Sequence, residues 1–152
     1  MFNGEGDHYD WELQGKQELY IPGNSWRLPN QSLSVDDIVG PQYLPRDLAR
    51  YELHRVWKVR ATVREGVRNI IARRDFYIDE DSWNIVQADL YDVRGELWRV
   101  QEGHLYVATE RPACVSAVGF YYDLLARRYV ADGLIIGDDE NDFTLGSEIN
   151  GA

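Results

Sequence analysis

The stretch RRDFYIDEDSWNIVQADLYDVRGELWRV, from Arg73 to Val100, decides the fold of this 152-residue chain. Apolar and polar residues alternate along it, and two short polar runs, Asp79–Ser82 and Asp92–Gly95, interrupt the alternation. A period of two is typical of strands with one buried face. Asp at the first position and Gly at the fourth favour a type I turn. The stretch therefore predicts a β-meander, with antiparallel strands joined by tight turns.

The same alternation extends the sheet on both sides of this stretch. Tyr51 to Val63 alternates clearly and ends at Glu65-Gly66, which predicts another turn. Further strands are predicted over residues 11–21, 115–123 and 126–136, and residues 105–109 either extend the strand that ends at Val100 or follow it as another. A long connection from Pro22 to Asp47 contains four prolines, and such loops are uncommon unless they cover something or carry function. Pro45 can open one short helical turn in it. The predicted fold is mainly β, an antiparallel meander with at most short helical segments.

Length and composition favour one soluble domain. The hydrophobic fraction of 44% is ordinary for a folded protein. We expect a single domain over residues 1–136, with the long loop at 22–47, and an acidic mobile tail over residues 137–152. A net charge of −10 argues against nucleic-acid partners. No apolar run approaches the ~20 residues of a membrane span, and the first residues resemble no signal peptide.

The register of the strands places a set of aromatic residues on one face. With hairpins centred on Glu65-Gly66 and on Glu80-Asp81, Arg55 faces Phe76, and Phe76 faces Ile85. Apolar residues then stay together across three strands, as a buried face demands. The predicted ligand-binding face consists of Tyr51, Leu53, Trp57, Phe76, Ile78, Trp83 and Ile85, with Arg55, Arg74 and Asp89 as polar insertions.

The polar insertions have two readings. By this register Arg74 lies diagonal to Asp89 and beside Trp57, within reach of an ion pair and of a cation–π contact. A charge on a buried face must be paired or must touch water or a ligand. One reading is a structural Arg–Asp pair, and the other is an aromatic cavity whose polar groups orient a ligand. Both place Arg74 within hydrogen-bonding reach of Asp89 or Gln87.

No catalytic signature accompanies these residues. The acidic turn Asp79–Asp81 is expected to be solvated, and a catalytic carboxylate needs a desolvated partner. His54 could be a base or a ligand, but a structural, hydrogen-bonded histidine near Tyr77 is commoner. The lone Cys114 excludes an intrachain disulfide, and a buried inert thiol is expected. We therefore predict no enzyme, no cofactor and no metal site.

Four segments of the chain resemble one known family, and they are DHYDWELQGKQELYIPGNSWR (residues 7–27), YELHRVW (51–57), the opening stretch (73–100) and YDLLARRY (122–129). That family is bacterial, is of unknown function and is grouped with outer-membrane lipoprotein-sorting proteins. It is similar in fold to the LolA and LolB carriers. The resemblance implies a curved antiparallel sheet, an incomplete barrel, whose concave aromatic face binds an apolar or lipid-like ligand without catalysis. It also implies a periplasmic or outer-membrane-associated location.

Members of that family are longer and begin with a signal peptide. This chain would then hold the last portion of the sheet, and unpaired sheet edges tend to recruit another copy. We therefore expect a homo-oligomer, most simply a dimer. Two alternatives remain open. The aromatic face could be buried against a partner or a second copy, or the chain could be a hydrolase with a site near His54.

Overall fold

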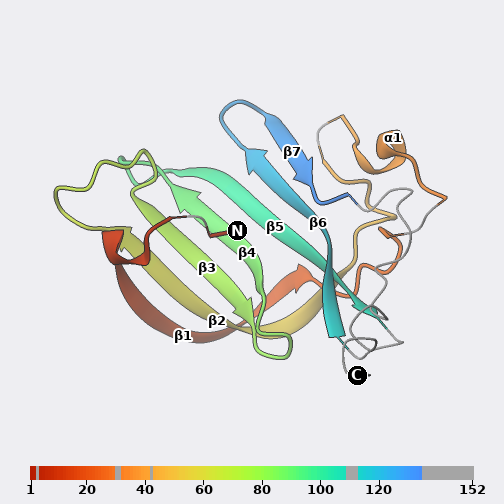
Figure 1. Ribbon diagram of the computed structural model, residues 1–152, viewed down its shortest axis with the longest axis horizontal. Helices are drawn as coiled ribbons and strands as arrows, with labels where there is room; N and C mark the ends of the chain where they lie inside the picture. Colours follow the sequence, from red (N-terminus) through yellow and green to blue (C-terminus); the bar gives the residue numbers. More distant parts are fainter. Residues whose placement is uncertain (3, 30–31, 42, 109–112, 135–152) are drawn as a thin grey trace, which may run out of the picture.

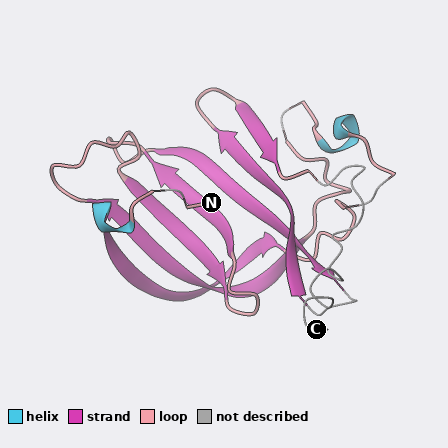
Figure 2. Cartoon of the chain, viewed as in Figure 1, coloured by secondary structure: helices cyan, strands magenta, loops and turns pink. Residues whose placement is uncertain are grey.

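Seven antiparallel strands form one unclosed sheet in the computed structural model, which describes residues 1–2, 4–29, 32–41, 43–108 and 113–134. Strand order follows the chain (Figure 1 and Figure 2). The strands are β1 (Tyr9–Pro22), β2 (Tyr51–Val63), β3 (Arg73–Asp79), β4 (Ile85–Tyr91), β5 (Leu97–Ala108), β6 (Ala113–Asp123) and β7 (Arg128–Asp132). The helices are short, η1 (Gly6–His8) and α1 (Val35–Ile38). The predicted fold class is confirmed, whereas the predicted tail at 137–152 lies outside the described residues.

The sheet bends toward one side, which we call the inner face. Ile21 at the end of β1 shares a buried cluster with Val86 of β4. Just after β1, the backbone N–H of Ser25 donates to the carbonyl oxygen of Leu105 in β5, at 2.7 Å. Because β1 and β5 are not neighbours in the sheet, these contacts require the strands to curl over the inner face. The sheet is an incomplete barrel.

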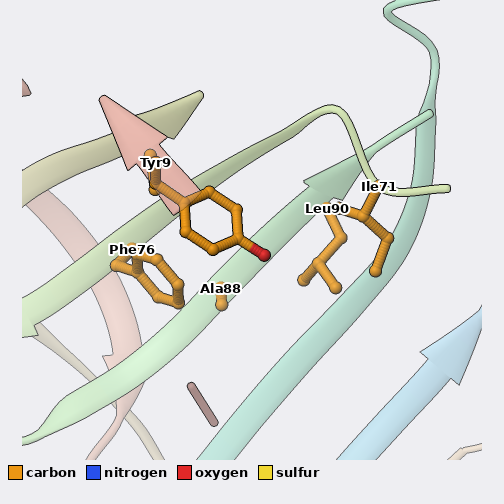
Figure 3. Close-up of a cluster of buried hydrophobic side chains, with 6 residues drawn as sticks. Tyr9, Ile71, Phe76, Ala88 and Leu90 are labelled. Carbon is orange, nitrogen blue, oxygen red and sulfur yellow. The ribbon is translucent and has the colours of Figure 1, made fainter. Parts of the chain in front are cut away.

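The opposite side, the outer face, is covered in part by the N-terminal residues, which Figure 1 shows in front of the sheet. A buried cluster on this face, drawn in Figure 3, contains Tyr9, Ala61, Ile71, Phe76, Ala88 and Leu90. Phe2 packs edge-on against Phe76, with ring centroids 5.9 Å apart. Met1 lies over Gly103, where an added Cβ would come within 2.6 Å of the Met1 Cε. A larger residue at Gly103 would displace the end of the Met1 side chain, which packs there.

The segment between β1 and β2, residues 23–50, covers the inner face at β6 and β7. Its buried residues pack against Phe120 of β6, and they are Leu28, Ile38 and Leu44. The Tyr129 hydroxyl of β7 donates to the carbonyl oxygen of Gly40, which ties the region around α1 to the sheet edge (Figure 1). The proline-rich connection therefore covers part of the molecule, as its length predicts.

Local sequence signals explain the helical parts of this segment. Ser34 and Asp37 form a reciprocal capping box at the start of α1, which satisfies backbone donors that the first turn leaves unpaired. The backbone N–H groups of Leu48 and Ala49 both donate to the carbonyl oxygen of Pro45. The turn predicted to open at Pro45 is confirmed.

The strand pairing corrects the predicted register. Phe76 lies opposite Val59, not opposite Arg55 as predicted, because residues 64–72 form a longer loop than a turn at Glu65-Gly66. This shift by an even number of residues keeps the same side chains on each face. Arg74 lies opposite Leu90, where Gln87 was predicted, and this odd shift puts Gln87 and Asp89 on the other face from Arg74.

The third predicted turn is confirmed. The backbone N–H of Gly95 donates to the carbonyl oxygen of Asp92, and one carboxylate oxygen of Asp92 accepts from the N–H groups of Arg94 and Glu96. The register shift next to this turn lies between Leu90 and Tyr91.

Candidate functional site

Most of the predicted ligand-binding residues share the outer face. By register they are Leu53, Arg55, Trp57, Arg74, Phe76, Ile78 and Ile85. Phe76 is 2% exposed because Phe2 and the residues around it cover its ring. Trp57 carries the ammonium group of Lys16 at 4.5 Å from its ring centroid. Phe2 and Lys16 therefore cover the rings of two predicted residues, Phe76 and Trp57.

Two more predicted residues lie away from this face. Trp83 adopts a positive φ of 57° in the turn after β3 and is 70% exposed. The Tyr51 hydroxyl donates to Glu102 of β5, and its ring lies 6.0 Å from that of His104. Burial and the neighbouring Glu102 carboxylate raise the pKa of Tyr51. Tyr51 therefore takes part in the inner packing between β2 and β5.

The predicted contact between Arg74 and Asp89 is wrong. Asp89 lies opposite Asp75 on the inner face, whereas Arg74 lies on the outer face. Asp89 instead accepts hydrogen bonds from the Tyr77 hydroxyl at 2.9 Å and from the Gln87 amide at 3.2 Å.

Arg74 is nevertheless buried, at 7% exposure. Its guanidinium lies 5.6 Å from the ring centroid of Phe2 and 5.3 Å from that of Tyr9. The sequence predicts a cation–π contact of Arg74 with Trp57. The contact exists, but its aromatic partners are Phe2 and Tyr9.

The inner face over β2 and β3 carries a charged cluster instead of an apolar cavity. Asp75 is 1% exposed and accepts two hydrogen bonds from Arg60, at 2.8 and 2.9 Å. Lys58 lies 3.2 Å from the same carboxylate and Arg73 3.7 Å from it. Burial alone would raise the pKa of Asp75, but the hydrogen bonds from Arg60 and Lys58 outweigh it and lower the pKa. The buried Asp75 carboxylate is therefore paired within the cluster.

His54 lies at the end of the inner face and has a partner other than Tyr77. Its Nδ1 is 2.9 Å from Asp79 Oδ1, so the expectation of a hydrogen-bonded histidine is confirmed. The hydrogen bond to Asp79 raises the pKa of His54. Asp79 is 4% exposed and also accepts from the backbone N–H of Ser82. The prediction of a fully solvated acidic turn is therefore wrong for Asp79.

A groove of about 350 Å³ over β5, β6 and β7 is the best candidate for a ligand site. We call it the tyrosine groove, and it is lined by Arg99, Val100, Gln101, Tyr121, Tyr122, Asp123, Arg128, Tyr129 and Val130. Its volume falls at the lower end of the range for small-molecule sites. Tyr121 pairs with Gln101 on one side and Val130 on the other, so their side chains share the outer face.

One end of the tyrosine groove is charged. Arg99 Nε lies 3.4 Å from Asp123 Oδ2, and Arg128 pairs with Asp123 across the hairpin. Two arginines and one aspartate leave the local charge positive. Arg99 Nε and Gln101 Oε1 are buried without a hydrogen-bond partner among the described residues. Buried polar atoms of this kind need an explanation, and a bound polar group is one.

Comparison with known proteins shows to which family the chain belongs. Residues 1–149 match the family described as "Protein of unknown function (DUF1329)". The chain belongs to the DUF1329 family. The resemblance to a bacterial family of unknown function, drawn from the sequence, is thereby confirmed.

Among curated proteins, the DUF1329 chain is 49% identical over 134 residues to an uncharacterized protein, PA3922, of Pseudomonas aeruginosa. The match covers 88% of this chain and 30% of that relative. The chain thus spans less than a third of the length of this relative.

A solved structure from the same family shows the same fold. A DUF1329 family protein from Desulfovibrio piger superposes with a TM-score of 0.50 at 14% identity, over 82% of this chain and 38% of that one. A candidate outer-membrane lipoprotein-sorting protein domain from Vibrio parahaemolyticus gives a TM-score of 0.47 at 8% identity, over 93% of this chain and 48% of the other. No helix among the described residues has the length and hydropathy needed to cross a bilayer.

Sequence reasoning missed the tyrosine groove. The hairpin around YYDLLARRY holds a signal for it, since a turn after Asp123 brings Tyr121 next to Val130. The contribution of Arg99 and Gln101 depends on the β5–β6 register, which is interrupted by a shift between His104 and Leu105. That shift cannot be placed from the alternation alone.

Proposed function

We propose that this chain binds an apolar or lipid-like ligand without catalysis, and that the ligand lies in the tyrosine groove. The observation that carries the proposal is the groove itself, where the outer-face side chains of Tyr121 and Val130 lie beside Arg99 and Arg128. An aromatic and aliphatic floor favours an alkyl chain, at about 0.8 kcal/mol per buried methylene. The positive end favours an anionic head group, because guanidinium groups bind carboxylates and phosphates well. The fitting ligand class is an anionic amphiphile.

A series of saturated fatty acids tests the proposal. Titration calorimetry with octanoate, decanoate and dodecanoate is expected to give an affinity that rises about tenfold for each two methylenes added, until the groove is filled. The corresponding alcohols lack the charge and are expected to bind more weakly. Equal affinity along the series, or no binding by any member, would contradict the proposal.

Two matched variants locate the site. Val130→Glu places a negative charge in the groove, and Leu53→Glu places one on the face that the sequence predicts. Val130 is 63% exposed and Leu53 is 54% exposed, so neither change disturbs the core. Val130→Glu is expected to weaken dodecanoate binding about tenfold or more, and Leu53→Glu to leave it unchanged. The reverse result would return the ligand to the predicted face.

A second candidate function is an interaction module. Large apolar side chains are exposed on the outer face of β1 and β2, and they include Trp11 (46%), Leu13 (62%), Tyr20 (67%) and Leu53 (54%). β1 is also an edge strand with an unpaired side, which favours association. Sedimentation at several concentrations distinguishes the two functions, because an oligomer that Leu53→Glu dissociates supports this one. The periplasm and the homo-oligomer remain predictions from the family resemblance.

A further inference from the structure

A second cavity, of about 210 Å³, lies where β1, β2, the β3–β4 turn and the β5–β6 end meet. Apolar residues form much of its wall, among them Ile21, Val86 and Leu105. Metal-ligating residue types also line it, and these are Glu52, His54, Asp79, Asp81 and Cys114. They come from separate parts of the chain, and each offers a nitrogen, oxygen or sulfur donor. This combination differs from an ordinary acidic surface patch.

The exposed thiol was not expected from the sequence. Cys114 is the only cysteine of the chain, and the sequence predicts a buried inert side chain. In the structure Cys114 is exposed and contributes to the cavity wall. It therefore adds a soft ligand to a cavity whose other donors are an imidazole and carboxylates.

The donor atoms around His54 have spacings that suit a small cation. His54 Nδ1 lies 2.9 Å from Asp79 Oδ1 and 3.7 Å from Asp81 Oδ2. Ligand atoms of His54, Asp79 and Asp81 all lie within 4.8 Å of one another. Two donors at about 2.1 Å from a tetrahedral Zn²⁺ stand roughly 3.4 Å apart. The observed distances bracket this value, so small side-chain adjustments bring all three donors to one ion.

The other nitrogen of His54 has a partner of the kind that supports a metal ligand. His54 Nε2 lies 3.4 Å from Glu52 Oε2. In metal sites the second ring nitrogen of a ligating histidine donates to a carboxylate, which fixes the tautomer and orients the ring. Glu52 can hold the Nε2 proton in this way while Nδ1 faces the two aspartates.

We propose that His54, Asp79 and Asp81 bind a divalent transition-metal ion such as Zn²⁺, with Glu52 as the outer partner of His54 and Cys114 at the open side of the cavity. The ion takes the place of the hydrogen-bonded proton between His54 Nδ1 and Asp79 Oδ1. It adds positive charge beside the buried carboxylate of Asp79 and the exposed carboxylate of Asp81. The proposal does not depend on the tyrosine groove.

The test is titration of the chelator-treated chain with ZnCl₂ by calorimetry, together with a thermal melt. One Zn²⁺ per chain and a raised melting temperature are expected. His54→Gln is expected to weaken Zn²⁺ binding by at least about a hundredfold and Glu52→Gln by about tenfold. Asp81→Asn serves as the variant that cannot unfold the chain, because the Asp81 side chain is 81% exposed.

A surface cluster in the same chain gives the matched control. Glu5, Asp7 and His8 also lie close enough for a common ion, but all three are exposed. His8→Gln is therefore expected to leave Zn²⁺ binding unchanged. Replacement of Zn²⁺ by Co²⁺ adds an optical readout, because a thiolate ligand gives a charge-transfer band that Cys114→Ser removes. Absence of Zn²⁺ binding in the micromolar range, or binding that survives both His54→Gln and Asp81→Asn, overturns the proposal.

Discussion

Two halves of the inner face are buried by different means. Over β2 and β3 the face holds charges, and Arg60, Lys58 and Arg73 surround the carboxylate of Asp75. Over β6 and β7 it holds aromatic rings, with Phe120 stacked near Tyr122 at 6.1 Å and near Tyr129 at 5.8 Å. Residues between β1 and β2, among them Leu28, Ile38 and Leu44, cover the aromatic half, whereas in the charged half the cations themselves surround the Asp75 carboxylate.

The comparison shows that one face of a sheet can bury paired charges in one half and covered aromatic rings in the other. Charges on a sheet face are tolerated where each carboxylate is paired and where the arginine and lysine stems still reach water. Aromatic rings need a cover, and the chain supplies one from a segment far away in sequence. The predictions below separate the two halves by their energetic cost.

Removal of a ring from the aromatic half is expected to have the largest effect. Phe120→Ala should lower the free energy of unfolding by about 3–5 kcal/mol, because Phe120 is fully buried and the cavity cannot close. Urea unfolding measures the change. Val130→Ala on the neighbouring strand, at an exposed position, should cost less than about 0.5 kcal/mol. Equal costs for the two variants would mean that the aromatic half is not core.

Loss of the central carboxylate should be the next largest effect. Asp75→Asn leaves three cations close together around a neutral side chain. The cost expected is about 2–3 kcal/mol, below the range for fully buried pairs, because the three cations are partly exposed. Asp10→Asn, which removes an exposed ion pair with Arg64, is the control and should cost under about 1 kcal/mol. A harmless Asp75→Asn would show that the charged half contributes nothing to stability.

Acid should destabilise the charged half selectively. The pKa of Asp75 is lowered in the folded chain, so its contribution is fully present above the ordinary aspartate pKa of about 3.9. That contribution is lost as the pH falls through the lower, folded pKa, where the carboxylate takes up a proton. Urea midpoints between pH 5 and pH 2 should therefore fall less steeply in Asp75→Asn than in the parent chain. Parallel curves would rule out this linkage.

His54 should give the smallest effect, with the opposite sign. Its pKa is raised by the hydrogen bond to Asp79, so its contribution is present below the ordinary histidine pKa of about 6.5. The contribution is lost as the pH rises through the higher, folded pKa. In metal-free protein the loss should be under about 1 kcal/mol, since the ring is partly exposed. His54→Gln should remove this pH dependence between pH 6 and pH 9.

The strands and their order could be predicted from the sequence, but their register could not. Period-two alternation is a local property, and it indicated strand residues in each of β1 to β7. It did not show that the segment from Leu105 continues β5, which runs from Leu97 to Ala108. The pairing of β2 with β3 depends on residues 64–72, which are held by a hydrogen bond from the Asn69 amide to the Tyr9 hydroxyl. That contact joins residues far apart in the chain, and no alternation reveals it. Ile70, in this loop, is exposed.

The candidate site was misplaced for the same reason. The odd shift in the β3–β4 register places Asp89 on the opposite face from Arg74. The N-terminal Phe2 packs against Phe76 on the face that the sequence assigns to a ligand. The choice of residue types was sounder than their placement. Arg74 does lie against aromatic rings, and His54 does have a hydrogen-bonded carboxylate.

The segment 23–50 has a consequence for synthesis on the ribosome. Successive hairpins of a meander pair residues close in sequence and can form as they emerge. The contact between Gly40 and Tyr129, however, joins residues 89 positions apart. The apolar residues of the segment, Leu28, Ile38 and Leu44, therefore have no cover until β6 and β7 have left the ribosome. During that interval the nascent chain exposes apolar side chains that favour aggregation, and a chaperone that binds apolar segments would act at this stage.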